Sequence, residues 1–270
     1  MRIGRMNTEN GPQLVIQDGE RWLAAAPAGY GLPQVLASGA TIAPNGGEVT
    51  GELLAPLVPG KIVAIGLNYM DHVRESKMEV PTSPLVFTKF PSSVTGPGAD
   101  VVIDEARTQR VDWEVELALV IGKTTRNVSV EDALDSVFGY TVANDVSARD
   151  MQFGDGQWVR GKSQDTFCPL GPVVVTPDEL GNPGELNLST RVNGVAMQDS
   201  NTRELIFGLA ELVAYCSENF TLEPGDVILT GTPWGCGEFM TPPVHLHPGD
   251  LVECEIEGIG VLANPVVAAS

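Results

Sequence analysis

At 270 residues, the chain is long enough to bury a complete hydrophobic core without disulfide or metal cross-links. Its 30 glycines and 20 prolines favour many short strands joined by tight turns over a helical bundle. The formal net charge of −19 would repel nucleic acid and anionic membrane surfaces, so we expect neither as a partner, and a site for an anionic ligand needs its own positive charge.

The N-terminal part of the chain predicts a small β-rich appendage. Short apolar pieces alternate with turn-rich stretches such as 45–47 over residues 1–55. We therefore expect a small N-terminal β-rich domain over residues 1–57 and a main domain over residues 58–270.

The start of the chain and its cysteines indicate an intracellular protein. The opening stretch MRIGRMNTENGPQ lacks an apolar signal core, and no apolar run reaches the length of a membrane span. The four cysteines have neither a zinc spacing nor a disulfide framework. We expect free thiols and a cytoplasmic location.

The main part of the chain predicts a run of strands with few helices. In chain order, strands are expected in the apolar runs 61–69, 85–90, 111–122, 137–147, 170–176, 226–231 and 251–266. Polar residues at 71–77 predict a short helical turn, and apolar residues at helical spacing predict one long helix over about 202–220, capped by Ser200, Asn201 or Thr202. The sequence therefore predicts a mainly β, α+β protein.

The predicted strand at 111–122 carries acidic residues on one of its two faces. Because side chains alternate along a strand, Asp112, Glu114 and Glu116 share a face with Ala118 and Val120. A face that begins acidic and ends apolar fits carboxylates at the mouth of a cavity, but charged pairs are also common on solvated strand edges. Alternation alone leaves both interpretations open.

A third acid, Asp145, follows the apolar stretch GYTVAN. Three carboxylates in one pocket would repel each other, and a hard cation is an economical way to keep all of them ionised. Because Mg²⁺ takes about six oxygens, three monodentate carboxylates would leave about three positions for a chelating 2-oxo acid and water. Spacing alone makes this metal site one possibility among several.

Five segments resemble, in order along the chain, the motif series of the fumarylacetoacetate hydrolase superfamily: IVAIGLNYMDHVRES, VDWEVELALVIGK, GYTVANDVSARDMQ, QWVRGKSQDTFCPLGP and LEPGDVILTGTPWGCG. The resemblance extends from about residue 61 to the C-terminus, and the N-terminal segment resembles the small extra domain of many bacterial members. It implies a β-rich roll with few helices and a homodimer. It also implies that Glu114, Glu116 and Asp145 are the ligands of Mg²⁺ or Mn²⁺.

His72 and Glu75 lie three residues apart, which places both on one face of a helical turn. A carboxylate beside an imidazole orients its tautomer and stabilises the imidazolium, so His72 would be a competent general base. An isolated pair of this kind is more often an exposed surface turn. The family resemblance instead implies a mobile lid that activates water or steers the substrate carboxylate.

Further residues match family positions around the substrate. The resemblance implies that the Lys162 ammonium holds a substrate carboxylate or stabilises a developing enolate. Gly231 and Thr232 match a loop that lines the pocket. Lys89 and Arg149 match positions near the substrate, with weaker claims on direct contact. Gln152 and Tyr69 match positions that could contact substrate, and a core or structural role is an equal alternative for both.

The sequence leaves the reaction open between related chemistries. The leading hypothesis is hydrolysis of a C–C bond in an acylpyruvate or fumarylacetoacetate-like β-diketo acid, with His72 and Glu75 activating water at a metal-bearing site. The alternative is an isomerase, tautomerase or decarboxylase of a 2-hydroxy-dienoate or 2-oxo diacid in aromatic catabolism, with proton transfer in place of water attack. A third hypothesis is a non-catalytic dimer with a structural metal. In each enzymatic case the ligand is a small anionic 2-oxo or enol acid.

Overall fold

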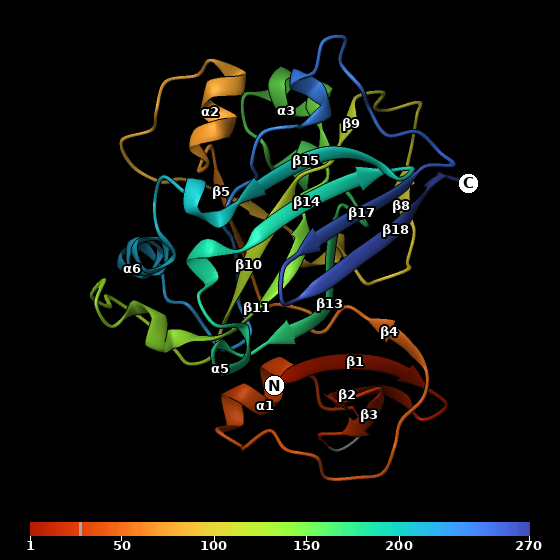
Figure 1. The fold of residues 1–270 in the computed structure, drawn as a ribbon, viewed down its shortest axis with the longest axis vertical. Helices are drawn as coiled ribbons and strands as arrows, with labels where there is room; N and C mark the ends of the chain where they lie inside the picture. The colour runs from red at the N-terminus through yellow and green to blue at the C-terminus, as the bar shows by residue number, and fades with distance from the viewer. Residues whose placement is uncertain (27–28) are drawn as a thin grey trace.

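The computed structural model describes residues 1–26 and 29–270. Most of the regular structure is β, arranged as one eleven-stranded and one five-stranded sheet with a further strand pair. Figure 1 shows the strands crossing the middle of the molecule, with short helices around them. The predicted mainly β, α+β fold is confirmed.

The larger sheet runs in the spatial order β3 (Arg21–Ala24), β2 (Gly11–Asp18), β1 (Arg2–Thr8), β13 (Cys168–Val175), β11 (Val137–Asn144), β10 (Val115–Ile121), β16 (Val227–Leu229), β5 (Ile62–Gly66) and β6 (Leu85–Lys89). In addition, β4 (Glu52–Leu54) pairs with β1, and β7 (Val94–Thr95) pairs with β13. The smaller sheet runs in the order β15 (Val195–Asn201), β14 (Asn187–Val192), β17 (Leu251–Ile256), β18 (Gly260–Ala268) and β8 (Val101–Ile103). A separate pair is formed by β9 (Val111–Asp112) and β12 (Ser147–Ala148).

The helices are short. They are α1 (Leu32–Ser38), α2 (Met70–Ser76), α3 (Arg149–Asp155), α4 (Val159–Lys162), α5 (Pro177–Leu180) and α6 (Leu209–Asn219). Single 3₁₀ turns are η1 (Pro91–Ser93), η2 (Ala133–Ser136), η3 (Pro183–Glu185), η4 (Thr202–Glu204) and η5 (Gly237–Phe239). None of the helices in the described residues combines the length and apolar character that a membrane crossing requires.

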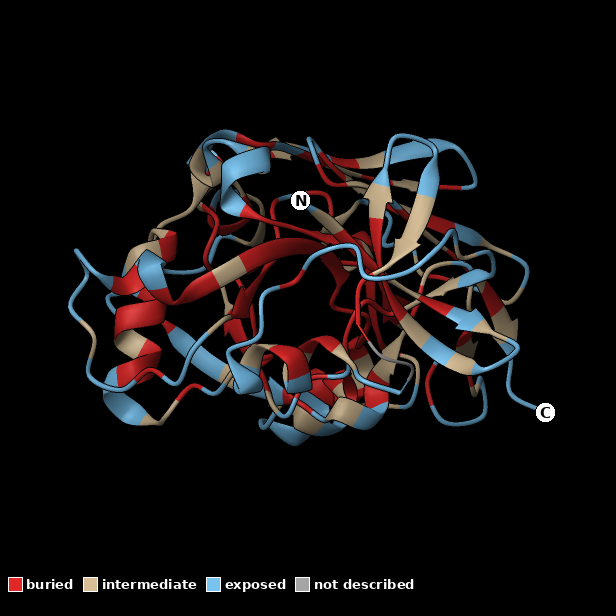
Figure 2. Ribbon diagram, turned by 90° about the horizontal axis from the view of Figure 1, so that it is seen from below, coloured by how far each residue is buried: buried red, intermediate tan, exposed pale blue. Residues whose placement is uncertain are grey.

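The central strand β10 separates two hydrophobic clusters. Leu117 and Leu119 belong to the cluster that includes Cys254 and Ile256 of the five-stranded sheet, and the strands of the two sheets contact each other. Ala118, on the opposite face, belongs to the second cluster, with residues of the N-terminal strands and α1. The strand is buried along its whole length, and Figure 2 shows the central strands in the colour of buried residues.

The N-terminal strands continue the larger sheet, because β1 pairs with β13 through Arg2 opposite Val175 and Ile3 opposite Val174. Ile3 and Leu57 also share the second hydrophobic cluster with Ile62 of β5. In Figure 1 this part, with α1, lies at the lower end of the molecule, beneath the strands of the smaller sheet. The division of the chain at residues 57 and 58 stays a prediction.

The long helix predicted over 202–220 is partly wrong. Helix α6 covers only Leu209–Asn219, and Gly208 precedes it with its backbone N–H bonded to the carboxylate of Glu211, 2.6 Å away. The preceding residues are held out of the helix by Asn68, which bonds the backbone N–H groups of Ile206 and Phe207 at 2.8 Å each. Asn201, a predicted cap, instead caps the short turn η4.

Candidate active site

The three predicted metal ligands converge where β10 begins and β11 ends. The antiparallel register places Val115 opposite Asn144, and the backbone N–H of Asp145 bonds the carbonyl oxygen of Glu114 at 2.9 Å. One carboxylate oxygen each of Glu114, Glu116 and Asp145 lies within 4.8 Å of the others. The three residues are 5%, 1% and 0% exposed. A solvated strand edge is therefore wrong for Glu114 and Glu116.

Three buried cations surround this acidic triad. Lys162 Nζ donates to Glu114 Oε2 and to Asp145 Oδ2, both at 2.7 Å. Lys89 Nζ lies 2.5 Å from Asp145 Oδ1, and Arg149 Nη1 lies 2.6 Å from Glu114 Oε1. Burial alone would raise the pKa of Glu114, but Lys162 and Arg149 outweigh it and lower that pKa to about 2.

Glu116 differs from the other two carboxylates. It accepts a hydrogen bond from the backbone N–H of Gly231 at 2.6 Å, and within the described residues it forms no salt bridge. Burial, then the charges of Asp145 and Glu114, hold its pKa well above the usual range. A divalent cation would balance this uncompensated carboxylate, and an all-carboxylate donor set suits Mg²⁺ or Mn²⁺. The residues present thus fit such an ion.

Helix α2 brings the predicted base to the same place. His72 Nδ1 lies 3.1 Å from Glu75 Oε2, and Glu75 Oε1 accepts the backbone N–H of Gly235 at 2.9 Å. The His72 ring meets Phe239 edge to face at a centroid distance of 5.2 Å. Because His72 is only 7% exposed, the surface-turn interpretation is wrong.

A compact cavity of about 40 Å³ joins these groups. Aromatic side chains form much of the rest of its wall: Phe87, Phe153, Trp158 and Phe239. Drug-sized ligands usually occupy pockets of roughly 300–1,000 Å³, so this cavity favours a small substrate. The predicted site residues that line it are His72, Glu114, Glu116, Arg149, Gln152, Lys162 and Thr232.

Some predicted substrate contacts occupy supporting positions instead. Lys89 is fully buried and bonds Asp145 and the carbonyl oxygen of Val146. Gly231 bonds Glu116 through its backbone, and Tyr69 lies in the apolar core between the sheets. In this conformation the three position the carboxylates or the core and do not line the cavity.

Asp112 is a supporting residue to which the sequence pattern assigned no role. It is fully buried and accepts hydrogen bonds from Arg149 Nε at 2.9 Å and from the backbone N–H groups of Trp113, Gly237 and Glu238 at 2.9, 2.8 and 3.1 Å. Its place on the same face of the predicted strand 111–122 as Glu114 was a usable signal, although the structure divides that stretch into β9 and β10. The aromatic residues of the cavity wall carried no such signal in the sequence, because they come from separate segments of the chain.

Comparison with known proteins places this fold and site in one family. The family model described as fumarylacetoacetate (FAA) hydrolase C-terminal matches residues 61–267. The chain belongs to the fumarylacetoacetate hydrolase family. The match begins at the start of β5 and includes every residue of the acidic triad and the His72–Glu75 pair.

Relatives in the fumarylacetoacetate hydrolase family include proteins named for a tautomerase activity. The chain is 52% identical over 218 residues to the mitochondrial oxaloacetate tautomerase fahd2 of Xenopus laevis, covering 80% of this chain and 68% of the relative. It is 51% identical over 223 residues to the mitochondrial oxaloacetate tautomerase FAHD2A of Bos taurus, covering 82% and 70%. The cytoplasmic location expected for this chain stays a prediction.

Solved structures of family members match over the full chain. A fumarylacetoacetate hydrolase from Exiguobacterium antarcticum superposes with a TM-score of 0.91 at 38% identity, covering 100% of both chains. A 2-hydroxyhepta-2,4-diene-1,7-dioate isomerase from Mycobacterium marinum gives a TM-score of 0.84 at 36% identity, covering 100% of this chain and 99% of the other. The family assignment and the fold therefore agree. The two solved structures are named for different reactions, a hydrolysis and an isomerisation.

Proposed function

We propose that this protein is a metal-dependent keto–enol tautomerase of a small 2-oxo dicarboxylic acid, with oxaloacetate as the first candidate. The observation that carries the proposal is one compact cavity lined by Glu114, Glu116, Lys162, Arg149 and His72, with Asp145 beside the two glutamates. Relatives at 51% and 52% identity that are named oxaloacetate tautomerases support it. They favour tautomerisation over the hydrolysis that the sequence first suggested.

The cavity supplies positive charge to a dianionic acid. Arg149 and Lys162 both line it, although the chain as a whole carries −19. Glu114, Glu116 and Asp145 would hold Mg²⁺ or Mn²⁺, and that ion, when bound, would polarise the 2-oxo group as a Lewis acid. Lys162 would stabilise the negative charge that develops on the substrate oxygen during enolisation.

Tautomerisation needs one proton to leave C3 of the acid and one to reach the oxygen on C2, so it consumes no co-reactant. His72 lines the cavity, and its Nδ1 faces Glu75. This arrangement leaves Nε2 as the ring nitrogen that takes or returns the C3 proton, with Glu75 stabilising the imidazolium.

Hydrolysis of an acylpyruvate is the second candidate, and the His72–Glu75 pair is the observation that favours it. The same pair would then deprotonate water for attack on the distal carbonyl. The pair also argues against a non-catalytic metal-binding dimer, since a structural metal needs no base. Decarboxylation of the same 2-oxo diacid would use the same cavity, and the oxaloacetate assay with Mg²⁺ or Mn²⁺ would detect it. The homodimer also stays a prediction.

A substrate panel with Mg²⁺ or Mn²⁺ separates these chemistries. We expect oxaloacetate tautomerisation to exceed acylpyruvate cleavage in kcat/KM. His72→Ala should lower any cleavage by about 10²- to 10⁴-fold, the usual loss for a general base. Tautomerisation should fall on the same scale, because His72 also carries the C3 proton, while metal affinity should remain because the metal ligands are unchanged. The matched control is His247→Ala, which removes a histidine with 65% of its side chain exposed.

Two outcomes would contradict the proposal. A wild-type enzyme that cleaves acylpyruvates with a higher kcat/KM than it tautomerises oxaloacetate is a hydrolase. A wild type that binds the metal but turns over no member of the panel is the non-catalytic protein.

A further inference from the structure

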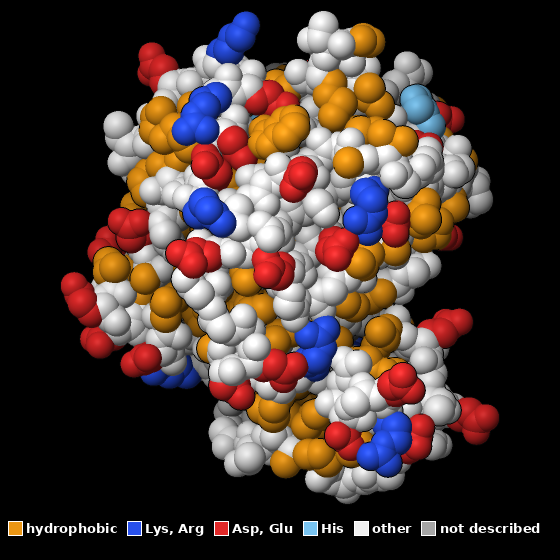
Figure 3. Space-filling view, viewed as in Figure 1, with side chains coloured by type: hydrophobic (Ala, Val, Ile, Leu, Met, Phe, Trp, Pro, Cys, Tyr) orange, Lys and Arg blue, Asp and Glu red, His pale blue; other side chains and the backbone are white. Residues whose placement is uncertain are grey.

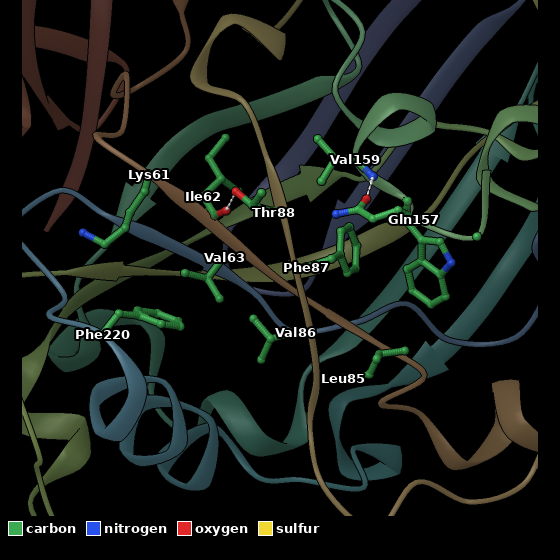
Figure 4. A pocket seen from close by; sticks show the side chains of 12 residues that line it. Lys61, Ile62, Val63, Leu85, Val86, Phe87, Thr88, Gln157, Val159 and Phe220 are labelled. Atoms are coloured by element: carbon green, nitrogen blue, oxygen red, sulfur yellow. Dashed lines mark hydrogen bonds between the residues drawn. The ribbon is translucent and has the colours of Figure 1, made fainter.

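A second hollow adjoins the site cavity. It is an open groove of about 450 Å³ along the edge strand β6 and the start of α4. Figure 4 shows Val63, Val86 and Phe220 around it, with Phe87 near the end where Gln157 and Val159 lie. The groove is large enough to hold several carbon atoms of a substrate tail.

The chemistry of the groove suits an uncharged, apolar group. None of its lining residues is acidic, although the chain has 35 acids. Its one charged lining residue, Lys61, forms an ion pair with Asp226. Much of the remaining lining is aliphatic or aromatic, including Leu85, Val86 and Phe220. The free energy of an alkyl chain would therefore fall when the chain leaves water for this groove.

Phe87 and Trp158 form the partition between the groove and the site cavity, because both residues line both spaces. Their rings meet edge to face, 5.3 Å apart at 69°. The Phe87 ring also lies 5.3 Å from Lys162 Nζ, so the partition stands beside the site's cation.

Gly66 makes room for the indole of this partition. A Cβ atom at Gly66 would lie 2.6 Å from Cζ3 of Trp158 and 3.3 Å from Cδ2 of Leu85. Carbon atoms in proteins pack at about 3.5–4.0 Å, so a larger residue would displace the ring. The end of β5 thus fixes where the partition stands.

We propose that the Phe87–Trp158 pair sets the permitted length of the substrate by closing the site cavity off from the groove. This inference rests on the proposed function. Oxaloacetate and the acylpyruvates share the 2-oxo acid end and differ at C4, which is a carboxylate in the first and an acyl carbon with an alkyl tail in the second. While both aromatic rings are present, the site cavity has no room for the alkyl tail. When Trp158 is truncated, the tail can pass from the site cavity into the apolar groove.

The test compares wild type with Trp158→Ala on oxaloacetate and on acylpyruvates of increasing tail length, following keto–enol conversion. We expect wild-type kcat/KM to fall as the tail grows. In Trp158→Ala it should instead rise by up to about 4-fold per CH₂ that enters the groove, from about 0.8 kcal/mol per buried CH₂. Phe87→Ala should shift the profile in the same direction.

Two variants separate a length filter from a general loss of structure. Trp158→Phe keeps an aromatic partition and should retain the wild-type length profile. Phe220→Ala, introduced into Trp158→Ala, removes an apolar contact within the groove and should reduce the gain on long tails. Calorimetric binding of the same acids gives a readout that does not require turnover.

A parallel loss on every substrate in Trp158→Ala, with no change in the ratio of long to short acids, would overturn the inference. So would a wild type that accepts long tails as well as short ones. These results are distinct from failure of the proposed function, which shows as a wild type inactive on oxaloacetate. In that case the length profile, measured by turnover or binding of acylpyruvates, still tests the pair.

Discussion

Asp112 joins two walls of the site through its carboxylate. One of its oxygens accepts the Arg149 Nε–H and the backbone N–H of Glu238, and the other accepts the backbone N–H of Gly237. The turn that begins at Gly237 carries Phe239, whose ring lies against His72. The same acid therefore holds a guanidinium that lines the cavity and the ring that backs the proposed base.

Asp112→Asn tests this positioning role. The side-chain amide nitrogen of the new asparagine would face an N–H donor of Arg149 or of the turn that begins at Gly237. Because two donors cannot bond each other, one of them must move. We expect kcat/KM for oxaloacetate to fall by about 10- to 100-fold, mainly through a higher KM, with metal affinity retained. Asp18→Asn, which alters an exposed Asp18–Arg21 pair, is the matched control. A lower melting temperature with unchanged kinetics would make Asp112 merely structural.

The residues of the site differ in how far the sequence could identify them. Alternation placed Glu114 and Glu116 on one strand face, and their burial decided between a cavity and a solvated edge. The convergence of Asp145 depends on the β10–β11 register, which spacing along the chain does not contain. The Phe87–Trp158 contact joins β6 to the turn before α4, so a tertiary contact alone reveals it.

Among the elements, helix α2 is the expected lid, and side-chain hydrogen bonds join it to neighbouring segments while His72 and Val73 are buried. Its Asp71 accepts a hydrogen bond from Ser200 of β15 at 2.5 Å, and Glu75 accepts one from Gly235. Arg74 forms an exposed ion pair with Glu204, of a type that contributes little to stability. The helix is thus fixed through side chains that can separate without breaking a sheet.

Binding of a small dianion should close this helix more firmly. With oxalate and Mg²⁺ present, amide hydrogen exchange over residues 70–82 should slow, because the closed state is then favoured. Ser200→Ala should raise exchange there in the free protein, while the core helix α6 changes in neither experiment. Equal exchange of the segment with and without oxalate would rule out a lid.

Element boundaries show where local patterns fail. The apolar spacing over 202–220 was helical, yet Ile206 and Phe207 donate their backbone N–H groups to Asn68 and stay outside α6, which begins at Leu209. The N-terminal segment was expected to be β-rich, but β1 was not identified in it, and the pairing of β1 with β13 joins residues more than 170 positions apart. Local sequence does not specify the neighbours of such a strand.

In the whole molecule acids outnumber bases, and the site pairs a few buried cations with buried acids. The chain has 16 lysines and arginines against 35 acids, and Figure 3 shows more acidic than basic side chains over the face in view. Three of the cations, Lys89, Arg149 and Lys162, are buried around the acidic triad. The net charge of −19 therefore repels an anionic substrate at long range, and the association rate of that substrate should rise with ionic strength.

Tautomerisation by this protein should depend on a divalent metal held by the acidic triad. The most direct measurement is the rate at which metal-stripped protein converts the enol form of oxaloacetate to the keto form, before and after addition of Mg²⁺ or Mn²⁺. Wild type should regain its activity and gain about 2.7 kcal/mol of stability at 100 times the metal Kd. Glu116→Ala should fold but show neither effect. Equal rates for stripped and metal-loaded wild type, or an unchanged metal response in Glu116→Ala, would contradict the account.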